Sequence, residues 1–206
     1  MGKILILNGS PRAPKSNSKR YAEIFTRHCP DETVYQNITK RNHQELCAAM
    51  EGYTDVLFVF PLYADSLPVG LLNFLKTLEA NPPASKPVIS ILINCGFLEY
   101  EQNEVAIRIM HFFCRRNGFT IGSVLMLGSG EAILETPFKY IAQRNIKRLA
   151  HSITNKDYRI LHATMPLPKS LFRLAAQSYW TRYGKKFGTT KEQMQTMEIE
   201  EINPFS

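Results

Sequence analysis

The sequence alternates between short apolar runs and longer segments with the periodicity of amphipathic helices. The runs cover residues 3–8, 55–60, 87–93 and 121–127, with a weaker run near 33–36. Three of them are apolar almost throughout, which is typical of strands covered on both faces in a parallel sheet. Five successive β-α units of this kind predict a doubly wound α/β fold with a five-stranded parallel sheet.

Local signals predict where several of the intervening helices begin and end. Asn42 with Glu45 has the spacing of a capping box, and Thr136 followed by a proline is typical of an N-cap with proline in the first turn. Another helix is expected from about residue 101 to 117, ended by Gly118 in the left-handed conformation.

The alternation stops near residue 155. Met165-Pro166-Leu167-Pro168 has the composition of a linker, and a further amphipathic helix is expected after it. Its apolar face comprises Leu171, Phe172, Ala175, Ala176, Tyr179, Trp180 and Tyr183. Thr189 with Glu192 predicts a capping box for a short final helix. The chain is therefore expected to contain a domain at 1–155 and a basic helical extension at 156–206.

The positive charge is concentrated in that extension. The net charge is +7, and the segment from Tyr158 to Lys191 holds seven Lys and Arg and no Asp or Glu. Because the charge is not spread over a recognition face, no nucleic-acid partner is predicted. The basic helix could lie on an anionic membrane surface. We favour packing of its apolar face on the domain or across a dimer, because amphipathic helices usually pack in this way.

Composition also limits the cellular setting. The longest apolar stretch near the N-terminus has only four residues, so no signal peptide and no membrane span are predicted. The four cysteines form no CxxC pair, which argues against a disulfide framework or a metal centre. We expect a cytoplasmic protein without a metal site.

The loop after the first strand has the parts of a phosphate site. Residues 8–20 read NGSPRAPKSNSKR, and the candidate donors are Ser10, Arg12, Ser16, Asn17 and Ser18. In open α/β sheets the first β-α loop and the following helix N-terminus commonly bind phosphate. The loop matches neither GxxxxGK[ST] nor GxGxxG, so a mononucleotide phosphate is the natural candidate.

Two loops resemble those of a known family. Asn8-Gly9-Ser10-Pro11-Arg12 followed by Ser16-Asn17-Ser18 resembles the phosphate loop of NAD(P)H-dependent FMN reductases and quinone reductases, which have a flavodoxin-like fold. Pro61-Leu62-Tyr63 with Leu67-Pro68 is similar to that family's PLY…LP loop, which carries the flavin ring. The resemblance covers about residues 3–155.

The resemblance assigns roles to the later loops. Leu62 and Tyr63 would cover the flavin ring, Asp65 or Ser66 would cap the next helix, and Phe97 would flank the ring. Cys95 is interpreted as a plain strand-end cysteine rather than a redox thiol. The turn at 128–131 has two glycines and could border the pocket, and we favour an ordinary β-α turn. The predicted cofactor-binding residues are Ser10, Arg12, Ser16, Asn17, Ser18, Pro61, Leu62, Tyr63, Ala64, Asp65, Asn94, Cys95, Gly96 and Phe97.

The resemblance implies an oxidoreductase that passes a hydride from NADPH or NADH through bound FMN to a small acceptor. The flavin would carry the chemistry, so no catalytic side chain is predicted. Quinone, free flavin, azo or nitro compounds and metal chelates all remain open as acceptors. A homodimer is also implied. The alternative is a flavodoxin-type electron carrier, although such carriers are usually acidic and have a T-x-T-G phosphate loop.

Overall fold

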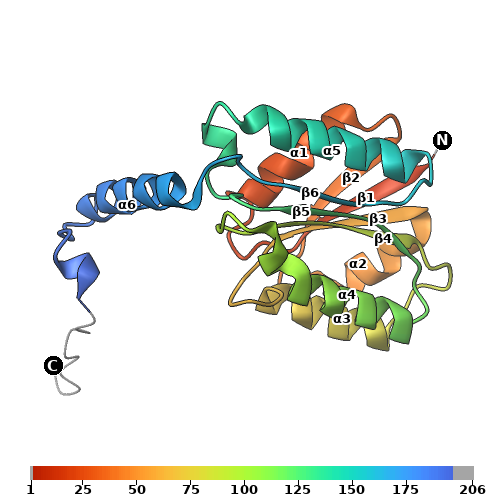
Figure 1. Ribbon diagram of the computed structural model, residues 1–206. Coiled ribbons are helices and arrows are strands. Elements are labelled where there is room, and N and C mark those ends of the chain that lie inside the picture. Colours follow the sequence, from red (N-terminus) through yellow and green to blue (C-terminus); the bar gives the residue numbers. More distant parts are fainter. Residues whose placement is uncertain (1, 197–206) are drawn as a thin grey trace, which may run out of the picture. The chain divides into compact units, whose positions relative to one another are not determined.

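The computed structural model describes residues 2–196, and its main feature is a six-stranded, fully parallel sheet (Figure 1). The strands are β1 (Lys3–Asn8), β2 (Glu32–Asn37), β3 (Asp55–Pro61), β4 (Val88–Asn94), β5 (Ile121–Leu127) and β6 (Ile160–Ala163). Their order is β2-β1-β3-β4-β5-β6. From β1 the chain adds β2 on one side of the sheet and then β3 to β6 on the other side. The point between β1 and β3 where this order switches is characteristic of the flavodoxin-like fold.

Helices cover both faces of this sheet. They are α1 (Asn17–His28), α2 (His43–Ala49), α3 (Val69–Ala80), α4 (Glu104–Arg116) and α5 (Lys139–Thr154), with short 3-10 turns η1 (Met50–Gly52), η2 (Tyr100–Asn103) and η3 (Ile133–Glu135). Figure 1 shows α1 and α5 on one face and α2, α3 and α4 on the other. The doubly wound architecture predicted from the alternating pattern is therefore present.

The core explains why the central runs are apolar throughout. In β1, β3, β4 and β5 nearly every residue is buried, because helices pack on both sides of these strands. Phe58 of β3 packs against Phe74 of α3, with ring centroids 6.0 Å apart. The edge strand β2 is only partly buried, which accounts for its weaker apolar signal.

The sheet contains one strand more than the sequence pattern indicated. β6 pairs in parallel with β5, from Val124 opposite Ile160 to Leu127 opposite Ala163. It has only four residues, and Ile160 at its start is exposed. An edge strand this short gives no apolar run, so the expected five strands are corrected to six.

The chain divides into two compact units, Met1–Met165 and Pro166–Ser206. The first unit extends past residue 155 because β6 belongs to its sheet. In the second unit the structure describes α6 (Lys169–Lys185) and η4 (Gln193–Gln195). No helix within residues 2–196 has the length and apolar character needed to cross a bilayer.

The predicted helix ends are partly confirmed. Gly118 ends α4 with φ +68°, as expected. The 101–117 segment splits into η2 and α4. Thr136 accepts a hydrogen bond from the Phe138 backbone N–H at 3.2 Å, and the regular helix α5 begins at Lys139.

Three cap predictions are wrong in detail. The Asn42 side chain makes no cap bond, because it bonds to Thr39 N and Asn37 O in the preceding turn instead. The residue before α3 is Pro68, so neither Asp65 nor Ser66 caps that helix. Before η4, the reciprocal bonds join Thr190 to Gln193, one residue after the predicted pair.

Candidate functional site

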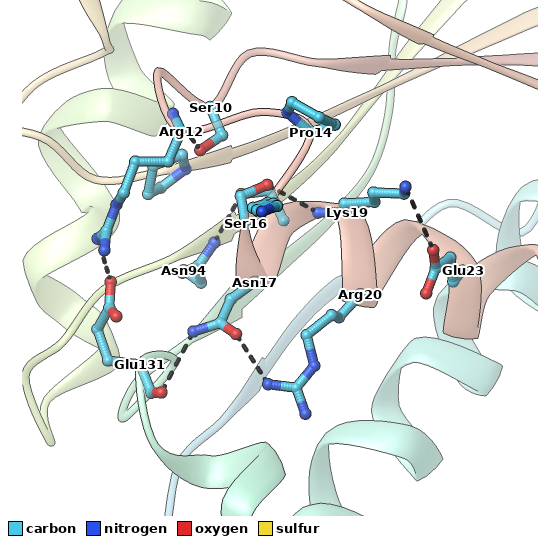
Figure 2. Close-up of a pocket in the computed structure, with 13 residues that line it drawn as sticks. Ser10, Arg12, Pro14, Ser16, Asn17, Lys19, Arg20, Glu23, Asn94 and Glu131 are labelled. Atoms are coloured by element: carbon cyan, nitrogen blue, oxygen red, sulfur yellow. Dashed lines mark hydrogen bonds and ion pairs between the residues drawn. The ribbon is translucent and has the colours of Figure 1, made fainter.

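A polar pocket lies at the carboxyl edge of the sheet, where the loops after β1, β3, β4 and β5 meet (Figure 2). Its volume is about 380 Å³. The lining residues are Ser10, Arg12, Pro14, Lys15, Ser16, Asn17, Ser18, Lys19, Arg20, Glu23, Pro61, Asn94 and Glu131. The pocket therefore lies beyond the carboxyl ends of parallel strands, where open α/β sheets bind ligands.

Buried Asn8, the last residue of β1, fixes both ends of the first loop. Its Oδ1 accepts from the Ser10 backbone N–H at 2.9 Å, and its Nδ2 lies 3.4 Å from Ser16 Oγ. The same Nδ2 donates to Tyr35 Oη at 2.8 Å and lies 3.3 Å from Asn37 Oδ1. The loop is therefore anchored to β2 before any ligand binds.

The three predicted serines all line the pocket and share one hydrogen-bonding arrangement. The hydroxyl oxygen of Ser10 accepts from Arg12 N, that of Ser16 from Lys19 N, and that of Ser18 from Asn94 Nδ2. A hydroxyl has one proton to donate as well as lone pairs to accept with. None of these three hydroxyls donates a hydrogen bond to another of the described residues. Each therefore has a proton available to donate to an anion.

Helix α1 adds backbone donors to the same pocket. Ser16 is its N-cap, with extended backbone angles and its side chain bonded to Lys19 N. The backbone N–H groups of Asn17 and Ser18 open the helix, where no carbonyl of an earlier turn can accept them. The positive end of the helix dipole points the same way, which favours an anion here.

The Asn17 side chain has a different role from the one predicted. Its Nδ2 lies 3.2 Å from the carbonyl oxygens of both Gly130 and Glu131, and its Oδ1 accepts from Arg20 at 3.1 Å (Figure 2). The amide therefore joins α1 to the loop after β5. Only its backbone N–H is left to face an anion.

The pocket is positively charged overall. Arg12, Lys15, Lys19 and Arg20 outnumber Glu23 and Glu131. Three of these cations already have carboxylate partners. Arg12 Nη2 lies 2.9 Å from Glu131 Oε1, Lys19 Nζ lies 4.0 Å from Glu23 Oε1, and Arg20 Nη1 lies 2.6 Å from Glu135 Oε1. All three pairs are exposed, so each contributes little to stability and Arg12 can turn to another anion.

The loop after β3 contributes one residue to the pocket and places its aromatic ring nearby on the surface. Pro61 lines the pocket, and Leu62 N donates to Asn94 O at 2.7 Å. Tyr63 and Ser66 exchange two backbone bonds around Ala64 and Asp65, whose φ values are +47° and +54°. This tight turn leaves Tyr63 57% exposed. Leu62, Tyr63, Ala64 and Asp65 lie outside the pocket lining.

In the loop after β4, Asn94 lines the pocket and its neighbours do not. Phe97 is 52% exposed. Cys95 is buried, and its thiol lies among Phe97 O, Glu99 O and Asn103 Nδ2. Burial raises the pKa of this thiol. Cys95 therefore supports the loop from inside. Of the four binding residues predicted at 94–97, Asn94 lines the pocket, and only Gly96 and Phe97 remain available to contact a flavin ring.

The loop after β5 is more than the ordinary turn that the sequence suggested. Gly130 lies so close to β4 that a Cβ there would come within 2.7 Å of Asn94 Cβ. Its carbonyl accepts from the buried hydroxyl of Tyr21 at 2.7 Å, and its N–H donates to Cys95 O. Glu131 then reaches Arg12 across the pocket (Figure 2).

Sequence reasoning missed six lining residues: Pro14, Lys15, Lys19, Arg20, Glu23 and Glu131. The basic residues on the first turn of α1 could have been found, because a helix N-terminus in a phosphate loop exposes that turn. The sequence indicated Glu131 as a pocket residue more weakly, through the two glycines that precede it after a strand. Within the described residues no group of three or more His, Cys, Asp or Glu side chains is placed to hold a metal ion.

Solved structures share this fold at low sequence identity. An NAD(P)H:quinone oxidoreductase from Methanothermobacter marburgensis aligns with a TM-score of 0.57 and 13% identity, over 74% of this chain and 97% of its own. An FMN-dependent NADH-azoreductase from Bacillus anthracis, solved in complex with FMN, aligns with a TM-score of 0.54 and 13% identity, over 74% and 99%. A flavodoxin from Streptococcus pneumonia aligns with a TM-score of 0.55 and 12% identity, over 75% and 99%.

The sequence itself matches no protein-family model and no curated protein. At this level of identity the structural likeness establishes the flavodoxin-like fold. The reductases among the neighbours are of the kind that the two loop motifs resemble, and a flavodoxin shares the fold equally well.

Proposed function

We propose that the protein is an FMN-dependent oxidoreductase that transfers a hydride from NAD(P)H to a small acceptor. The observation that carries the proposal is the pocket at the end of β1, with three serine protons, two helix-terminal N–H groups and an excess of cations. Such a donor set fits a phosphate dianion, which has three strong acceptor oxygens.

The surroundings of this pocket also fit the rest of FMN. Tyr63 and Phe97 are large exposed aromatic side chains on the loops after adjacent strands β3 and β4. Planar ligands are usually held by apolar side chains together with a few polar groups. Pro61, the last residue of β3, lines the pocket and stands two residues before Tyr63, so this strand end and its loop can serve both parts of the ligand.

The chain's own residues would bind and orient the cofactor rather than react. Ser10, Ser16 and Ser18 would donate to the phosphate, Arg12 would turn from Glu131 toward it, and Leu62, Tyr63, Gly96 and Phe97 would border the ring. When bound, FMN supplies the hydride-accepting and hydride-donating chemistry, so no side-chain acid or base is required.

Finer features of the proposal extend beyond the site. We infer a cytoplasmic protein that uses NADPH or NADH, reduces a quinone, free flavin or similar small molecule, and forms a homodimer. The named reductases among the structural neighbours support an NAD(P)H-linked reaction. The flavodoxin neighbour supports the alternative, a carrier that binds FMN without oxidising NAD(P)H.

Steady-state kinetics of the serine variants test the proposal. NADPH and NADH oxidation would be followed with a quinone acceptor and increasing FMN. In Ser10→Ala/Ser18→Ala, the FMN concentration for half-maximal rate should rise about tenfold or more, because two phosphate hydrogen bonds are lost. The rate at saturating FMN should stay close to that of the unaltered protein, since these hydroxyls bind and do not react.

The exposed Ser85→Ala variant is the matched control and should leave both values unchanged. A rate that is independent of added or bound flavin would refute the proposed function. FMN binding without any pyridine-nucleotide oxidation would favour the carrier instead.

A further inference from the structure

The second unit presents a cluster of aromatic side chains that no other residue between 166 and 196, the part of this unit that the structure describes, covers. Tyr179 and Trp180 contact each other with centroids 5.2 Å apart, and Tyr183 contacts Trp180 at 5.9 Å and Phe187 at 5.2 Å. These four residues, the aromatic cluster, are 44–71% exposed. Gly184 is the only buried residue of α6. An exposed apolar surface of this kind usually marks an interaction site.

The segment that carries the cluster is strongly basic. From residue 169 to 191 there are six Lys and Arg and no Asp or Glu. Arg182 and Lys185 lie beside the cluster in sequence, and Arg182 Nη2 donates to Ser178 Oγ at 3.3 Å on the same helix. Four Glu follow at positions 192, 198, 200 and 201, so the second unit as a whole holds six Lys and Arg against four Glu. A partner therefore has to satisfy both the aromatic side chains and the positive charge of the helix.

Charge decides between the candidate partners. The first unit carries 19 Lys and Arg against 14 Asp and Glu, so neither this chain's domain nor a second copy offers a negative surface overall. Two copies of α6 facing each other would also place like charges together. A negatively charged partner complements this helix best.

The aromatic residues favour a lipid surface over an acidic protein. Trp and Tyr, with an apolar body and a polar end, are the side chains enriched at membrane–water interfaces, and Lys and Arg beside them bind anionic headgroups. Phe172, Tyr179 and Tyr183 follow one another at helical spacing on one side of α6. Leu174 lies on the opposite side of the helix, and Leu171, which was expected on the apolar face, lies about 100° around the helix from Phe172.

We propose that α6 and the aromatic cluster form a docking surface for an anionic lipid bilayer, on which the helix lies flat. At 1.5 Å per residue, the 17 residues of α6 extend for about 25 Å along the surface. The sequence alone favours packing of this helix on protein. We prefer the bilayer because the described residues 166–196 include no apolar partner for the cluster and because the first unit has the same sign of charge.

Trp180 gives a direct measurement, because it is the only tryptophan of the chain. The full-length protein would be titrated with phosphatidylcholine vesicles that contain about a third phosphatidylglycerol, and its emission recorded. We expect a shift to shorter wavelength and flotation with these vesicles. Pure phosphatidylcholine should give neither. Raising the salt from about 0.1 M to about 1 M should release the protein, because the Debye length falls from about 10 to about 3 Å.

Variants separate charge from apolar contact. Arg182→Gln/Lys185→Gln preserves good helix formers and should weaken vesicle binding about tenfold or more. Tyr179→Ser/Tyr183→Ser retains the charge and should weaken it to a similar degree. The matched control, Lys40→Gln/Lys76→Gln, removes two exposed cations of the first unit and should bind normally.

Three results would overturn the proposal. One is equal binding to neutral and anionic vesicles, and another is equal loss in the control and the Arg182/Lys185 variant. The third is an emission that is already that of a buried tryptophan and does not respond to vesicles. If Tyr179→Ser/Tyr183→Ser then lowered the mass in solution from dimer to monomer, α6 would be a subunit contact instead.

Discussion

Asn8 shows how one buried side chain prepares a binding loop without facing the ligand. It is completely buried at the end of β1 and is not among the residues that line the pocket. Its bonds to Ser10 N and toward Ser16 hold both ends of the phosphate loop. An amide is suited to this position because it donates and accepts at once, whereas a carboxylate at neutral pH only accepts.

Replacing Asn8 should damage both stability and binding. In Asn8→Ala the Ser10 N–H loses its acceptor, and Tyr35 Oη and Asn37 Oδ1 each lose one donor while they keep the bond to each other. The free energy of unfolding should therefore fall by about 1–3 kcal/mol. FMN affinity should fall as well, because the loop is no longer held. Urea unfolding and FMN fluorescence titration would measure the two effects.

Asn73→Ala on the exposed side of α3 serves as the control and should change neither quantity. If Asn8→Ala bound FMN with unaltered affinity, Asn8 would have only a structural role and the loop would not need it.

The residues around the site differed in how far the sequence could locate them. Ser10, Ser16 and Ser18 follow the first strand directly, so local sequence was enough to place them together. Lys19 and Arg20 were missed because their exposure depends on how α1 leaves the loop. The backbone bonds of Cys95 to Leu127 and Gly130 and the use of the Asn17 amide depend on the end of β5 and its loop, more than 30 residues away from either. Such contacts leave no local pattern in the sequence.

At the scale of elements, backbone conformation decides where α4 ends. Gly118 has φ +68°, a region that residues with a Cβ rarely occupy. Lys86 donates to Asn117 O at 2.8 Å beside it, which satisfies a carbonyl at the helix end. The glycine was found from sequence because a left-handed C-cap has a strong residue preference.

Two glycine substitutions should therefore have opposite effects. Gly118→Ala forces a Cβ into the left-handed region and should lower the free energy of unfolding by about 1 kcal/mol. Gly70→Ala, in α3 with nothing within 4 Å of the added Cβ, should leave stability unchanged or raise it by up to about 1 kcal/mol. Denaturant unfolding of the pair would show this, and equal effects would mean that φ does not govern position 118.

The sequence predicted most elements but not all of their limits. Central strands and amphipathic helices carry their burial in their own pattern, so β1, β3, β4 and β5 were recognisable. β6 was not, because an exposed four-residue edge strand is defined by pairing with β5 rather than by composition. Helix-capping hydrogen bonds were the least predictable. The side chains of Asn42 and Thr190 can bond to several nearby backbone groups, and these alternatives differ little in energy.

At the scale of the whole molecule, buried thiols make stability depend on alkaline pH. Burial raises the pKa of Cys114 from 9.0 to about 12. Between these values the unfolded chain loses this proton and the folded chain keeps it. The contribution of Cys114 to stability is therefore intact below about pH 9 and falls as pH rises, by at most about 1.4 kcal/mol per pH unit.

Cys114→Ala should flatten the pH dependence of unfolding between about pH 9 and 11, even though the variant starts from lower stability because of the cavity. Urea midpoints at several pH values would measure the slope. Cys29→Ala is the comparison, because that thiol is only half-buried and should alter the slope less. An unchanged slope in Cys114→Ala would contradict the expected protonation of this thiol.

The central claim for the molecule is that the pocket after β1 holds FMN and that a pyridine nucleotide reduces it. An anaerobic absorption titration tests this most directly: full-length protein is supplied with FMN, freed of excess cofactor, and titrated with NADPH and then NADH. The account predicts retained flavin bands that bleach with about one equivalent of at least one of the two nucleotides, since a hydride carries both electrons. Protein that retains no flavin, or flavin that neither nucleotide bleaches, would contradict it.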